Sequence, residues 1–215
     1  MPNRDLHNER RDYNASSLSK KHIQSSPFKQ FGNWLDKAST TNTIKDPTAM
    51  TLATVDDSLQ PQSRIVLLKE FSEQGLLFYT HYQSKKGNQL KNNPKASCCF
   101  FWADLDQQIR IEGSVEKISE DQSDQYFHSR PKDSQLASYI SNQSQAVASR
   151  AELEQKMQHA SQKFANKKVP RPEQWGGYRL IPHKFEFWQG RPNRLHDRFI
   201  YEKNPTGWTI TRLAP

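Results

Sequence analysis

Residues 96–118 read ASCCFFWADLDQQIRIEGSVEKI, and this stretch does most to decide the fold. Its first part, 96–102, is a short apolar run, and its last part, 108–118, alternates between apolar and polar residues. Alternation is typical of a strand with one buried face, because successive side chains point to opposite faces. Two such runs joined by a turn favour an antiparallel sheet or barrel.

The same kind of short run recurs on both sides of this stretch. Strands are predicted at 49–55, 64–69, 76–80, 177–181, 184–189, 198–202 and 208–213. Helices are predicted at 27–41, 84–92, 120–129, 132–142 and 150–166. We therefore expect a mainly β fold with peripheral α-helices (α+β), built as a single domain over residues 27–215. Residues 1–26 hold few apolar side chains and are expected to form a flexible N-terminal arm.

Composition narrows the class of protein. The chain has 215 residues and a formal net charge of +8, which suggests nucleic acid, anionic lipid or a phosphorylated small molecule as partner, although a merely basic surface would give the same charge. Cys98 and Cys99 are adjacent and point to opposite strand faces, so neither a disulfide nor a metal site is expected. No apolar run reaches the roughly 20 residues of a membrane span. With no signal peptide evident, a cytoplasmic location is expected.

Two segments have the residue types of a phosphate site. Ser84-Lys85-Lys86-Gly87 opens a predicted helix, where free N–H groups and two lysines favour an anion, although a solvated basic turn is the commoner use of such a segment. Tyr126, Arg130 and Ser134 are four residues apart, and Pro131 interrupts their helix, so they are expected to converge at a bend. They form a phosphate cradle or the polar face of a surface helix, and the spacing favours neither.

The segment Arg194-Leu195-His196-Asp197-Arg198 concentrates charge. If it is extended, Arg194, His196 and Arg198 lie on one face, and Asp197 points away from His196, so no His–Asp dyad is expected. Three such groups on one face favour a bound anion over a rim of solvated charges. Trp188-Gln189-Gly190 adds an aromatic plane and a backbone that a ligand can approach.

Arg64 and Lys69 flank another apolar run and fall on opposite faces by parity, either as ligands of two anions or as solvated strand ends. The sequence contains no phosphate-loop, dinucleotide-binding or His-Glu zinc motif, and no Cys or Ser has an evident base nearby. Covalent catalysis is therefore disfavoured, and a bound cofactor that supplies the chemistry fits better.

Together these segments resemble the pyridoxine/pyridoxamine 5′-phosphate oxidase family. The resemblance covers nearly all of the chain after Pro27 and is carried by Asp46-Pro47-Thr48-Ala49-Met50, Arg64 to Lys69, Phe78-Tyr79-Thr80, Tyr126 to Pro131, Phe187-Trp188-Gln189-Gly190, Arg194 to Arg198 and Arg212-Leu213-Ala214-Pro215. It implies a split β-barrel homodimer with FMN at the subunit interface. The implied reaction oxidises pyridoxine 5′-phosphate or pyridoxamine 5′-phosphate to pyridoxal 5′-phosphate with O2, releasing H2O2 and, from the amine, NH3.

The resemblance also implies which residues form the site. FMN contacts would fall on Arg64, Ile65, Val66, Leu67, Leu68, Lys69, Tyr79, Thr80, Lys85, Lys86, Gln108, Gln143, Ser144, Trp188 and Arg198. The substrate would contact Lys69, Tyr126, Arg130, Ser134, Arg194 and His196, with Arg10 and Tyr13 in a lid formed by the N-terminal arm. Arg194, His196 and Asp46 would be catalytic, Arg194 covering the pyridine ring and His196 bonding a ring substituent or assisting proton removal. Lys85 stands where such sequences often carry arginine, and lysine lacks the planar fork of a guanidinium.

Other classes of function remain open at this point. Another flavin protein on the same barrel would not need the second phosphate site of Tyr126, Arg130 and Ser134. A nucleic-acid-binding module would gather its basic residues into one patch, whereas here they are scattered among apolar strands. A purely structural dimer would leave residues 188–198 without an account. The preference between the two substrates and any second product site are also open.

Overall fold

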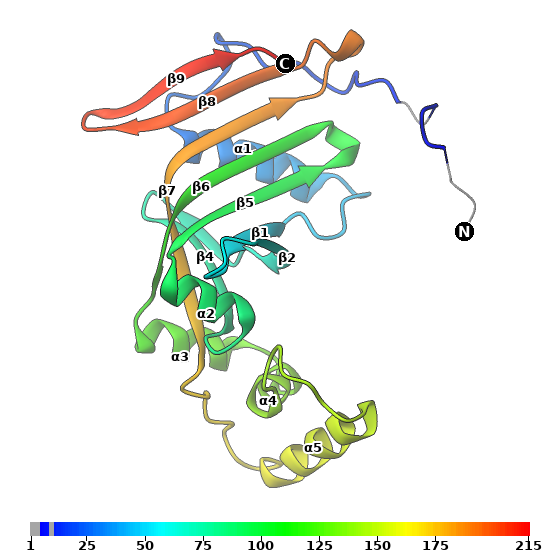
Figure 1. The fold of residues 1–215 in the computed structure, drawn as a ribbon, viewed down its shortest axis with the longest axis vertical. Helices are drawn as coiled ribbons and strands as arrows, with labels where there is room; N and C mark the ends of the chain where they lie inside the picture. Colours follow the sequence, from blue (N-terminus) through cyan, green and yellow to red (C-terminus); the bar gives the residue numbers. More distant parts are fainter. Residues whose placement is uncertain (1–4, 9–10) are drawn as a thin grey trace. The chain divides into compact units, whose positions relative to one another are not determined.

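The computed structural model describes residues 5–8 and 11–215 of the chain. The chain forms two compact units whose segments alternate in sequence. The terminal unit comprises the chain up to Ala49, Cys99–Ile111 and His183–Pro215, and the central unit comprises Met50–Cys98 and Glu112–Pro182. Three strands run through both units, namely β5 (Lys95–Trp102), β6 (Gln107–Lys117) and β7 (Trp175–Gln189) (Figure 1).

The described strands form a nine-stranded sheet in the order β2-β1-β5-β6-β7-β4-β3, with β8 beside β7 and β9 beside β8. The other strands are β1 (Ala49–Val55), β2 (Pro61–Leu67), β3 (Glu70–Ser72), β4 (Gly75–His81), β8 (Asp197–Asn204) and β9 (Gly207–Leu213). The pairs β3–β4, β4–β7, β7–β8 and β8–β9 are antiparallel. The predicted mainly β class with peripheral helices is therefore confirmed, while the short strand β3 was not predicted.

In the terminal unit, helix α1 (Pro27–Thr40) buries the apolar stripe that its sequence spacing predicts. The Phe31 ring lies 5.2 Å from that of Phe100, and the Trp34 ring lies 5.4 Å from that of Phe187. Burying side chains of this size contributes roughly 1.5–3 kcal/mol each. Packing against the strands of this unit therefore stabilises α1 more than local propensity does.

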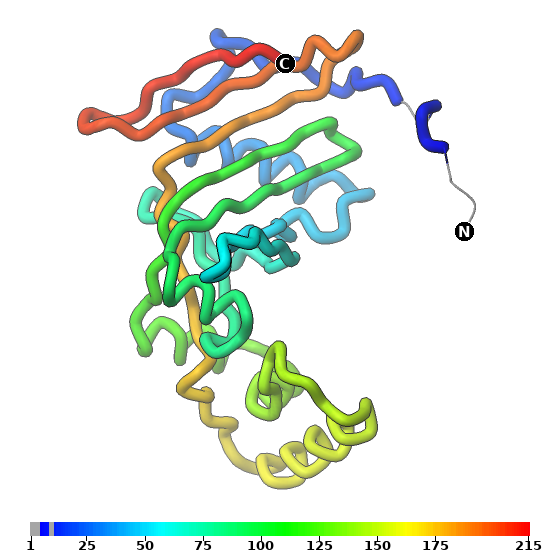
Figure 2. Tube along the Cα trace, in the orientation of Figure 1, coloured from blue at the N-terminus to red at the C-terminus, as the bar shows by residue number. Residues whose placement is uncertain are grey.

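Residues 11–26 lie against strands of the same terminal unit, and Figure 2 shows this blue part of the trace passing along β8 and β9. Leu18 is buried, and its N–H donates to the carboxylate of Asp197 over 3.0 Å. The Tyr201 hydroxyl donates to the carbonyl of Gln24 over 2.6 Å. These contacts dock the arm at Leu18 and Gln24. The predicted domain boundary after residue 26 stays a prediction.

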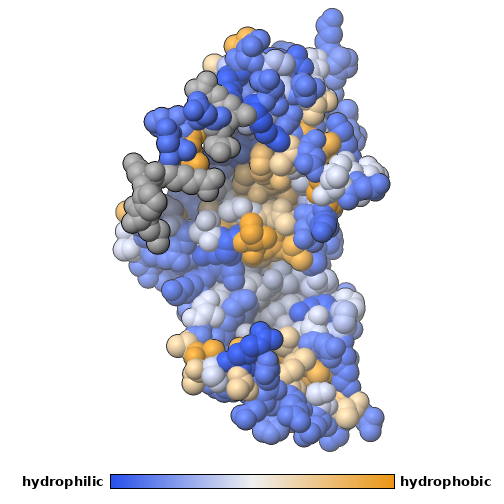
Figure 3. Space-filling model, turned by 90° about the vertical axis from the view of Figure 1, so that its right-hand side faces the viewer, coloured by the Kyte–Doolittle hydropathy of each residue, from blue (hydrophilic) through white to orange (hydrophobic). Residues whose placement is uncertain are grey.

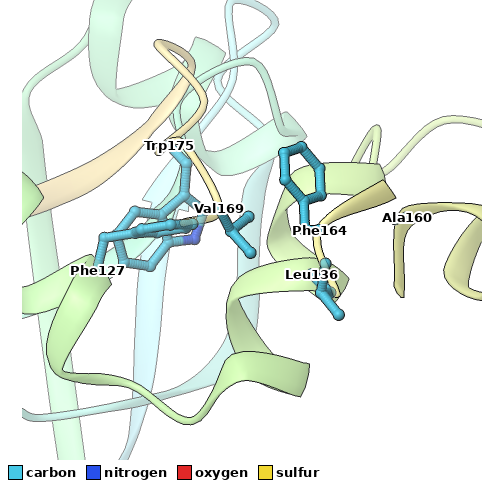
Figure 4. Packing of buried hydrophobic residues seen from close by; sticks show 6 residues of the cluster. All are labelled: Phe127, Leu136, Ala160, Phe164, Val169 and Trp175. Carbon is cyan, nitrogen blue, oxygen red and sulfur yellow. The ribbon is translucent and has the colours of Figure 1, made fainter. Parts of the chain in front are cut away.

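The central unit holds helices α2 (Lys85–Asn92), α3 (Glu120–Ser129), α4 (Lys132–Ile140) and α5 (Arg150–Lys163). The N-cap serines Ser84, Ser119 and Ser149 accept hydrogen bonds from backbone N–H groups of α2, α3 and α5, as such caps do. A hydrophobic cluster joins α3, α4 and α5 to the start of β7. Figure 4 shows its Phe127 and Trp175 rings lying together, and their centroids are 5.2 Å apart.

The structure corrects the prediction of two strands at 177–181 and 184–189. Both belong to the single strand β7, which passes through Pro182. Proline removes one donor from the ladder, but its fixed φ is compatible with extended backbone. A proline at this point therefore does not need to end the strand.

The surface is largely polar with isolated apolar side chains. The face drawn in Figure 3 is mostly hydrophilic with small hydrophobic patches. Ile65, Phe101 and Leu195 are among the exposed large hydrophobic residues. Across the described part of the chain, every helix is too short or too polar to cross a bilayer.

Candidate functional site

A cavity of about 600 Å³ opens in the central unit, within the range typical of ligand pockets. Among the described residues, its lining contains three basic side chains, Lys69, Lys86 and Arg130, and no Asp or Glu. The lining residues are Ile65, Val66, Leu67, Lys69, Tyr79, Thr80, His81, Lys86, Tyr126, Arg130, Pro131, Ser134, Ala137, Ser138, Ser141, Gln143 and Trp175. The resemblance assigned residues between 64 and 143 to FMN or to a substrate phosphate. Most of these residues line this one cavity.

One wall of the cavity comes from β2 and the residues that follow it. Ile65, Val66, Leu67 and Lys69 contribute to the lining, whereas Leu68 is buried in the core and does not. Arg64 is directed elsewhere, because its guanidinium donates to Thr54 Oγ1 and, over 3.2 Å, to Gln89 Oε1. Strand β2 ends at Leu67, so the prediction that Arg64 and Lys69 lie on opposite faces of one strand stays a prediction. Burial lowers the pKa of Arg64.

Lys86 is the most constrained cation of the cavity. Its Nζ donates to Thr80 Oγ1 and to Gln143 Oε1, both over 3.0 Å. The Ser84 hydroxyl caps α2 by accepting from the Gly87 N–H, which fixes the turn that carries Lys86. Burial, together with the nearby positive charge of Arg64, lowers the pKa of Lys86 to about 8. All its partners are neutral, so its charge is uncompensated among the described residues.

Lys85 and Ser144 lie outside the main cavity lining. The Lys85 N–H donates to Ser144 Oγ over 3.3 Å, and Ser144 has a left-handed backbone with φ of 74°. The exposed Lys85 side chain instead lines a second cavity of about 300 Å³ with Asp56 and Asp57. The structure therefore separates the two lysines that the sequence grouped.

Tyr126, Arg130 and Ser134 converge as predicted, because the chain turns between the end of α3 and the start of α4 and all three line the cavity. The Arg130 guanidinium donates to Ser138 Oγ and to the Ser134 carbonyl, each over 2.9 Å. It also lies 4.7 Å from the centre of the Trp175 ring. Burial lowers the pKa of Arg130. Neutral partners hold this cation, as they hold Lys86.

Stacked aromatic rings also line the cavity. The Tyr79 and Tyr126 rings are stacked with centroids 3.8 Å apart, and Trp175 continues the stack 5.6 Å from Tyr79. Burial raises the pKa of Tyr79 to about 12 and also raises that of Tyr126. Both phenols therefore stay protonated at neutral pH and are available as hydrogen-bond donors.

Sequence reasoning missed Trp175, Ser138 and His81. Trp175 lines the cavity because β7 pairs with β4, which places Trp175 opposite His81. The two residues are far apart in the sequence. Ser138 lies four residues beyond Ser134 on α4, so continuing the four-residue spacing would have found it. His81 is buried, and burial followed by the charge of Lys86 lowers its pKa.

In the terminal unit, four predicted residues form a second cluster. The Tyr13 ring lies 5.6 Å from Trp188 and 5.3 Å from His196, and the Trp188 and His196 rings are 4.7 Å apart. The Arg194 guanidinium lies 5.3 Å from the centre of the Tyr13 ring. The cluster offers aromatic faces, one guanidinium and one imidazole, which suits a flat heteroaromatic ligand.

The expected extended face of Arg194, His196 and Arg198 is wrong. Asn193 and Arg194 adopt left-handed backbone, with φ of 57° and 62°, so the chain turns before β8 begins. His196 accepts a hydrogen bond at Nδ1 from the Arg191 N–H over 3.0 Å. Burial, followed by the charge of Arg194, lowers the pKa of His196. Because Nδ1 accepts this hydrogen bond, the neutral form of the imidazole carries its proton on Nε2.

Arg198 and Asp197 have partners of their own. Arg198 Nε donates to Glu186 Oε1 over 2.9 Å, and a second guanidinium nitrogen donates to the Ala214 carbonyl. Asp197 accepts from Leu18 and, over 2.9 Å, from Arg212. Asp197 thus serves these donors, which agrees with the expectation that it forms no dyad with His196.

The remaining predicted residues belong to neither of the two clusters described above. Gln108 is half-buried on β6, and Asp46 is exposed, with its carbonyl accepting from the Ala49 N–H over 3.0 Å. Arg10 falls outside the residues that the structure describes. Within residues 5–8 and 11–215, no group of three His, Cys, Asp or Glu side chains could hold a metal ion.

Comparison with protein families matches both parts of the chain. Residues 37–164 match the family model described as pyridoxamine 5′-phosphate oxidase, and residues 175–215 match the pyridoxine 5′-phosphate oxidase C-terminal dimerisation region. The curated pyridoxine/pyridoxamine 5′-phosphate oxidase 1 of Hydrogenovibrio crunogenus is 55% identical over 100% of both chains. That of Trichormus variabilis is 48% identical over 96% of both chains.

Solved structures share the fold. PhzG from Burkholderia lata, in complex with tetrahydrophenazine-1-carboxylic acid, aligns with a TM-score of 0.86 and 30% identity, over 92% of this chain and 98% of its own. A pyridoxamine 5′-phosphate oxidase-related, FMN-binding protein of Nostoc punctiforme aligns with a TM-score of 0.70 at 17% identity, over 90% and 100%. The predicted split-barrel fold is confirmed.

Proposed function

We propose the function of this chain from one premise, that it belongs to the pyridoxine/pyridoxamine 5′-phosphate oxidase family. It is an FMN-dependent oxidase that converts pyridoxine 5′-phosphate or pyridoxamine 5′-phosphate to pyridoxal 5′-phosphate with O2, releasing H2O2 and, from the amine, NH3. The observation that carries this function is the cavity lined by Lys69, Lys86 and Arg130, in which no carboxylate of residues 5–8 or 11–215 takes part. Phosphorylated ligands supply the missing negative charge.

The donor set fits FMN. The cavity combines cations and hydroxyls for a phosphate with apolar side chains of β2 and stacked aromatic rings beside them. Lys86, Thr80 and Gln143 already form one hydrogen-bonded group, which is pre-organised for a polar ligand. FMN would be held by these residues and by Ile65 to Lys69 and Tyr79, with Arg64, Leu68, Lys85, Gln108, Ser144, Trp188 and Arg198 as further proposed contacts.

When bound, FMN supplies the acceptor for a hydride from the substrate's C4′ carbon and the subsequent reaction with O2. The protein contributes position and charge. We assign the substrate phosphate to Lys69, Tyr126, Arg130 and Ser134, because all four line the cavity and the last three converge at the α3–α4 bend. Charge-assisted bonds from Arg130 and Lys69 are the strong ones of this set.

Arg194 and His196 are assigned to the pyridine ring. Burial lowers the pKa of His196, and its Nδ1 accepts from the Arg191 N–H, so the neutral imidazole carries its proton on Nε2. Nε2 therefore donates to a ring substituent, which favours that role over proton removal. The Arg194 guanidinium beside the ring stabilises negative charge that develops there.

Further assignments rest on the family pattern. Asp46 is proposed as a contributor to catalysis, and Arg10 and Tyr13 as substrate contacts of the arm. The dimerisation region at residues 175–215 supports a homodimer. A cytoplasmic site of action is proposed, and neither a nucleic acid nor a membrane is proposed as partner.

A second candidate function is oxidation of a larger ring system, favoured by the likeness to PhzG bound to tetrahydrophenazine-1-carboxylic acid. That ligand carries a carboxylate and no phosphate. Lys69 and Arg130, the two cations assigned to the substrate, favour a phosphate, because a phosphate carries nearly twice the charge of a single carboxylate.

The decisive experiment adds pyridoxine 5′-phosphate anaerobically to FMN-loaded protein and follows the visible flavin spectrum. Bleaching of the oxidised band, reversed by air, is the expected result. Bound FMN with an unchanged band would overturn the substrate assignment, and tetrahydrophenazine-1-carboxylic acid would then be the next ligand to add.

A further inference from the structure

Asp106 occupies a special position at the turn between β5 and β6. It is buried, with 6% of its surface exposed, and it adopts left-handed backbone with φ of 52°. Its carbonyl accepts from the Gly190 N–H over 2.7 Å and from Gln189 Nε2 over 3.2 Å. The backbone of Asp106 is therefore fixed to the segment that follows Trp188.

The carboxylate of Asp106 faces a different partner, the N-terminal arm. It accepts from the N–H groups of Asn14 and Ala15, each over 3.2 Å, and forms an ion pair with the Arg11 guanidinium. The same guanidinium donates to the carbonyl of Ala103 over 2.8 Å. Three donors from one short segment converge on one buried carboxylate, and charge-assisted bonds of this kind are the stronger class.

Tyr13 lies between these donors in the sequence. Its ring contacts those of Trp188 and His196, and the Arg11 guanidinium lies 4.9 Å from its centre. A side chain at Gly190 would approach the Tyr13 ring within 2.7 Å. The arm is thus closely fitted at this point, and the position of Tyr13 depends on where Asp106 holds its neighbours.

We propose that Asp106 is a positioning residue that latches the arm through Arg11, Asn14 and Ala15 and so holds Tyr13 against His196. This inference rests on the proposed function, in which Tyr13 and His196 contact the substrate. The Asp106 carbonyl fixes the turn, because it accepts hydrogen bonds from the Gly190 N–H and from Gln189 Nε2. The turn therefore does not need the carboxylate. The carboxylate serves the arm.

A second carboxylate gives an internal reference. Asp197 accepts from the Leu18 N–H over 3.0 Å, four residues beyond Asn14. Asp197 also binds Arg212 and lies within 3.6 Å of Arg191, so it has partners outside the arm. Loss of the Asp106 latch is therefore expected to free the amides of Asn14 and Ala15 and to leave that of Leu18 protected.

The test compares Asp106→Asn with Asp104→Asn in the full-length, FMN-loaded protein. Asparagine tolerates left-handed backbone, so the turn is kept while the charge is lost. Asp104 is an exposed carboxylate of the same turn, and none of the described arm contacts involves it. Arg11→Gln breaks the same latch from the exposed side and serves if Asp106→Asn does not fold.

Two readouts are measured, hydrogen exchange of the arm amides without substrate, and steady-state kinetics with pyridoxine 5′-phosphate. Exchange at Asn14 and Ala15 is expected to rise about tenfold in Asp106→Asn and Arg11→Gln, the factor for one lost charge-assisted bond. KM is expected to rise at least threefold with kcat within twofold, because positioning for binding is lost. FMN content, Leu18 exchange and Asp104→Asn should match the parent protein.

Unchanged exchange at Asn14 and Ala15 in both variants would refute the latch. Faster exchange with unchanged KM would refute its positioning role toward the substrate. If the parent protein does not turn over pyridoxine 5′-phosphate at all, the proposed function fails, and exchange alone then decides whether Asp106 latches the arm.

Discussion

Each unit of the molecule holds a group of cations, and the two groups are compensated in opposite ways. In the central unit, Lys69, Lys86 and Arg130 line a cavity to which the described residues contribute no Asp or Glu. In the terminal unit, three guanidinium groups pair with buried carboxylates, in the pairs Arg11–Asp106, Arg198–Glu186 and Arg212–Asp197. The second group is neutralised within the fold, whereas the first is left for a ligand. The distribution of carboxylates therefore locates the anion site, which the net charge of +8 cannot do.

The largest effect on this contrast between unpaired and paired cations is expected from removing Arg130. Arg130→Ala should raise KM for pyridoxine 5′-phosphate about 100-fold to 1000-fold, roughly 3–4 kcal/mol, because a buried charge-assisted contact to phosphate is lost. Arg150→Ala is the control, since Arg150 is exposed on α5 and pairs with Glu154. Steady-state kinetics measure both. A change below threefold in Arg130→Ala would show that this cation does not await the substrate.

The compensated group should respond in stability. Glu186→Gln removes the charge that pairs with Arg198 and Arg110, so the free energy of unfolding should fall by about 2–3 kcal/mol. Glu154→Gln, an exposed carboxylate on α5, is the matched control and should change it by less than about 0.5 kcal/mol. Urea unfolding monitored by tryptophan fluorescence measures both variants. Equal stability of the two would mean that Glu186 does not compensate these charges.

Because of Lys86, the affinity of the cavity for FMN should depend on pH. The pKa of this lysine is lowered to about 8, so it is positive below pH 8 and neutral above. An anion favours the protonated form, hence affinity for FMN should be highest below pH 8 and fall by up to about tenfold per pH unit above it. Quenching of FMN fluorescence between pH 7 and pH 10 measures this, with Lys86→Arg expected to remain flat. A flat curve for the parent protein would contradict the assignment of Lys86 to the cofactor.

The smallest effect is expected at Ser138, which accepts from Arg130 over 2.9 Å. Ser138→Ala should raise KM for pyridoxine 5′-phosphate about fivefold, corresponding to roughly 1 kcal/mol for one hydrogen bond. Ser161→Ala on α5, an exposed serine, should leave KM unchanged. If Ser138→Ala also leaves it unchanged, Ser134 and Trp175 suffice to orient the guanidinium.

Local spacing predicted part of the cavity from sequence. Tyr126, Arg130 and Ser134 converge because the four-residue period and Pro131 are local features, and Ser84 caps α2 for the same reason. Trp175 could not be found in this way, because its place depends on pairing between β4 and β7. Contacts between distant strands leave no periodic signal in one sequence.

The turn before β8 shows a different limit. An extended segment was expected, and left-handed residues at Asn193 and Arg194 overturned it. Asparagine after Pro192 is a turn signal that could have been weighed more heavily than the alternation of charges. For Arg194 itself the sequence carries no such signal, because arginine rarely adopts this conformation.

The two units alternate along the chain, and this limits how the gene can recombine. The terminal unit is assembled from three separate stretches and the central unit from two, and β5, β6 and β7 pass from one into the other. No single recombination point separates them, so neither unit can be copied into another gene as one contiguous fragment. New substrates are therefore more readily reached by replacing individual cavity residues than by exchanging modules.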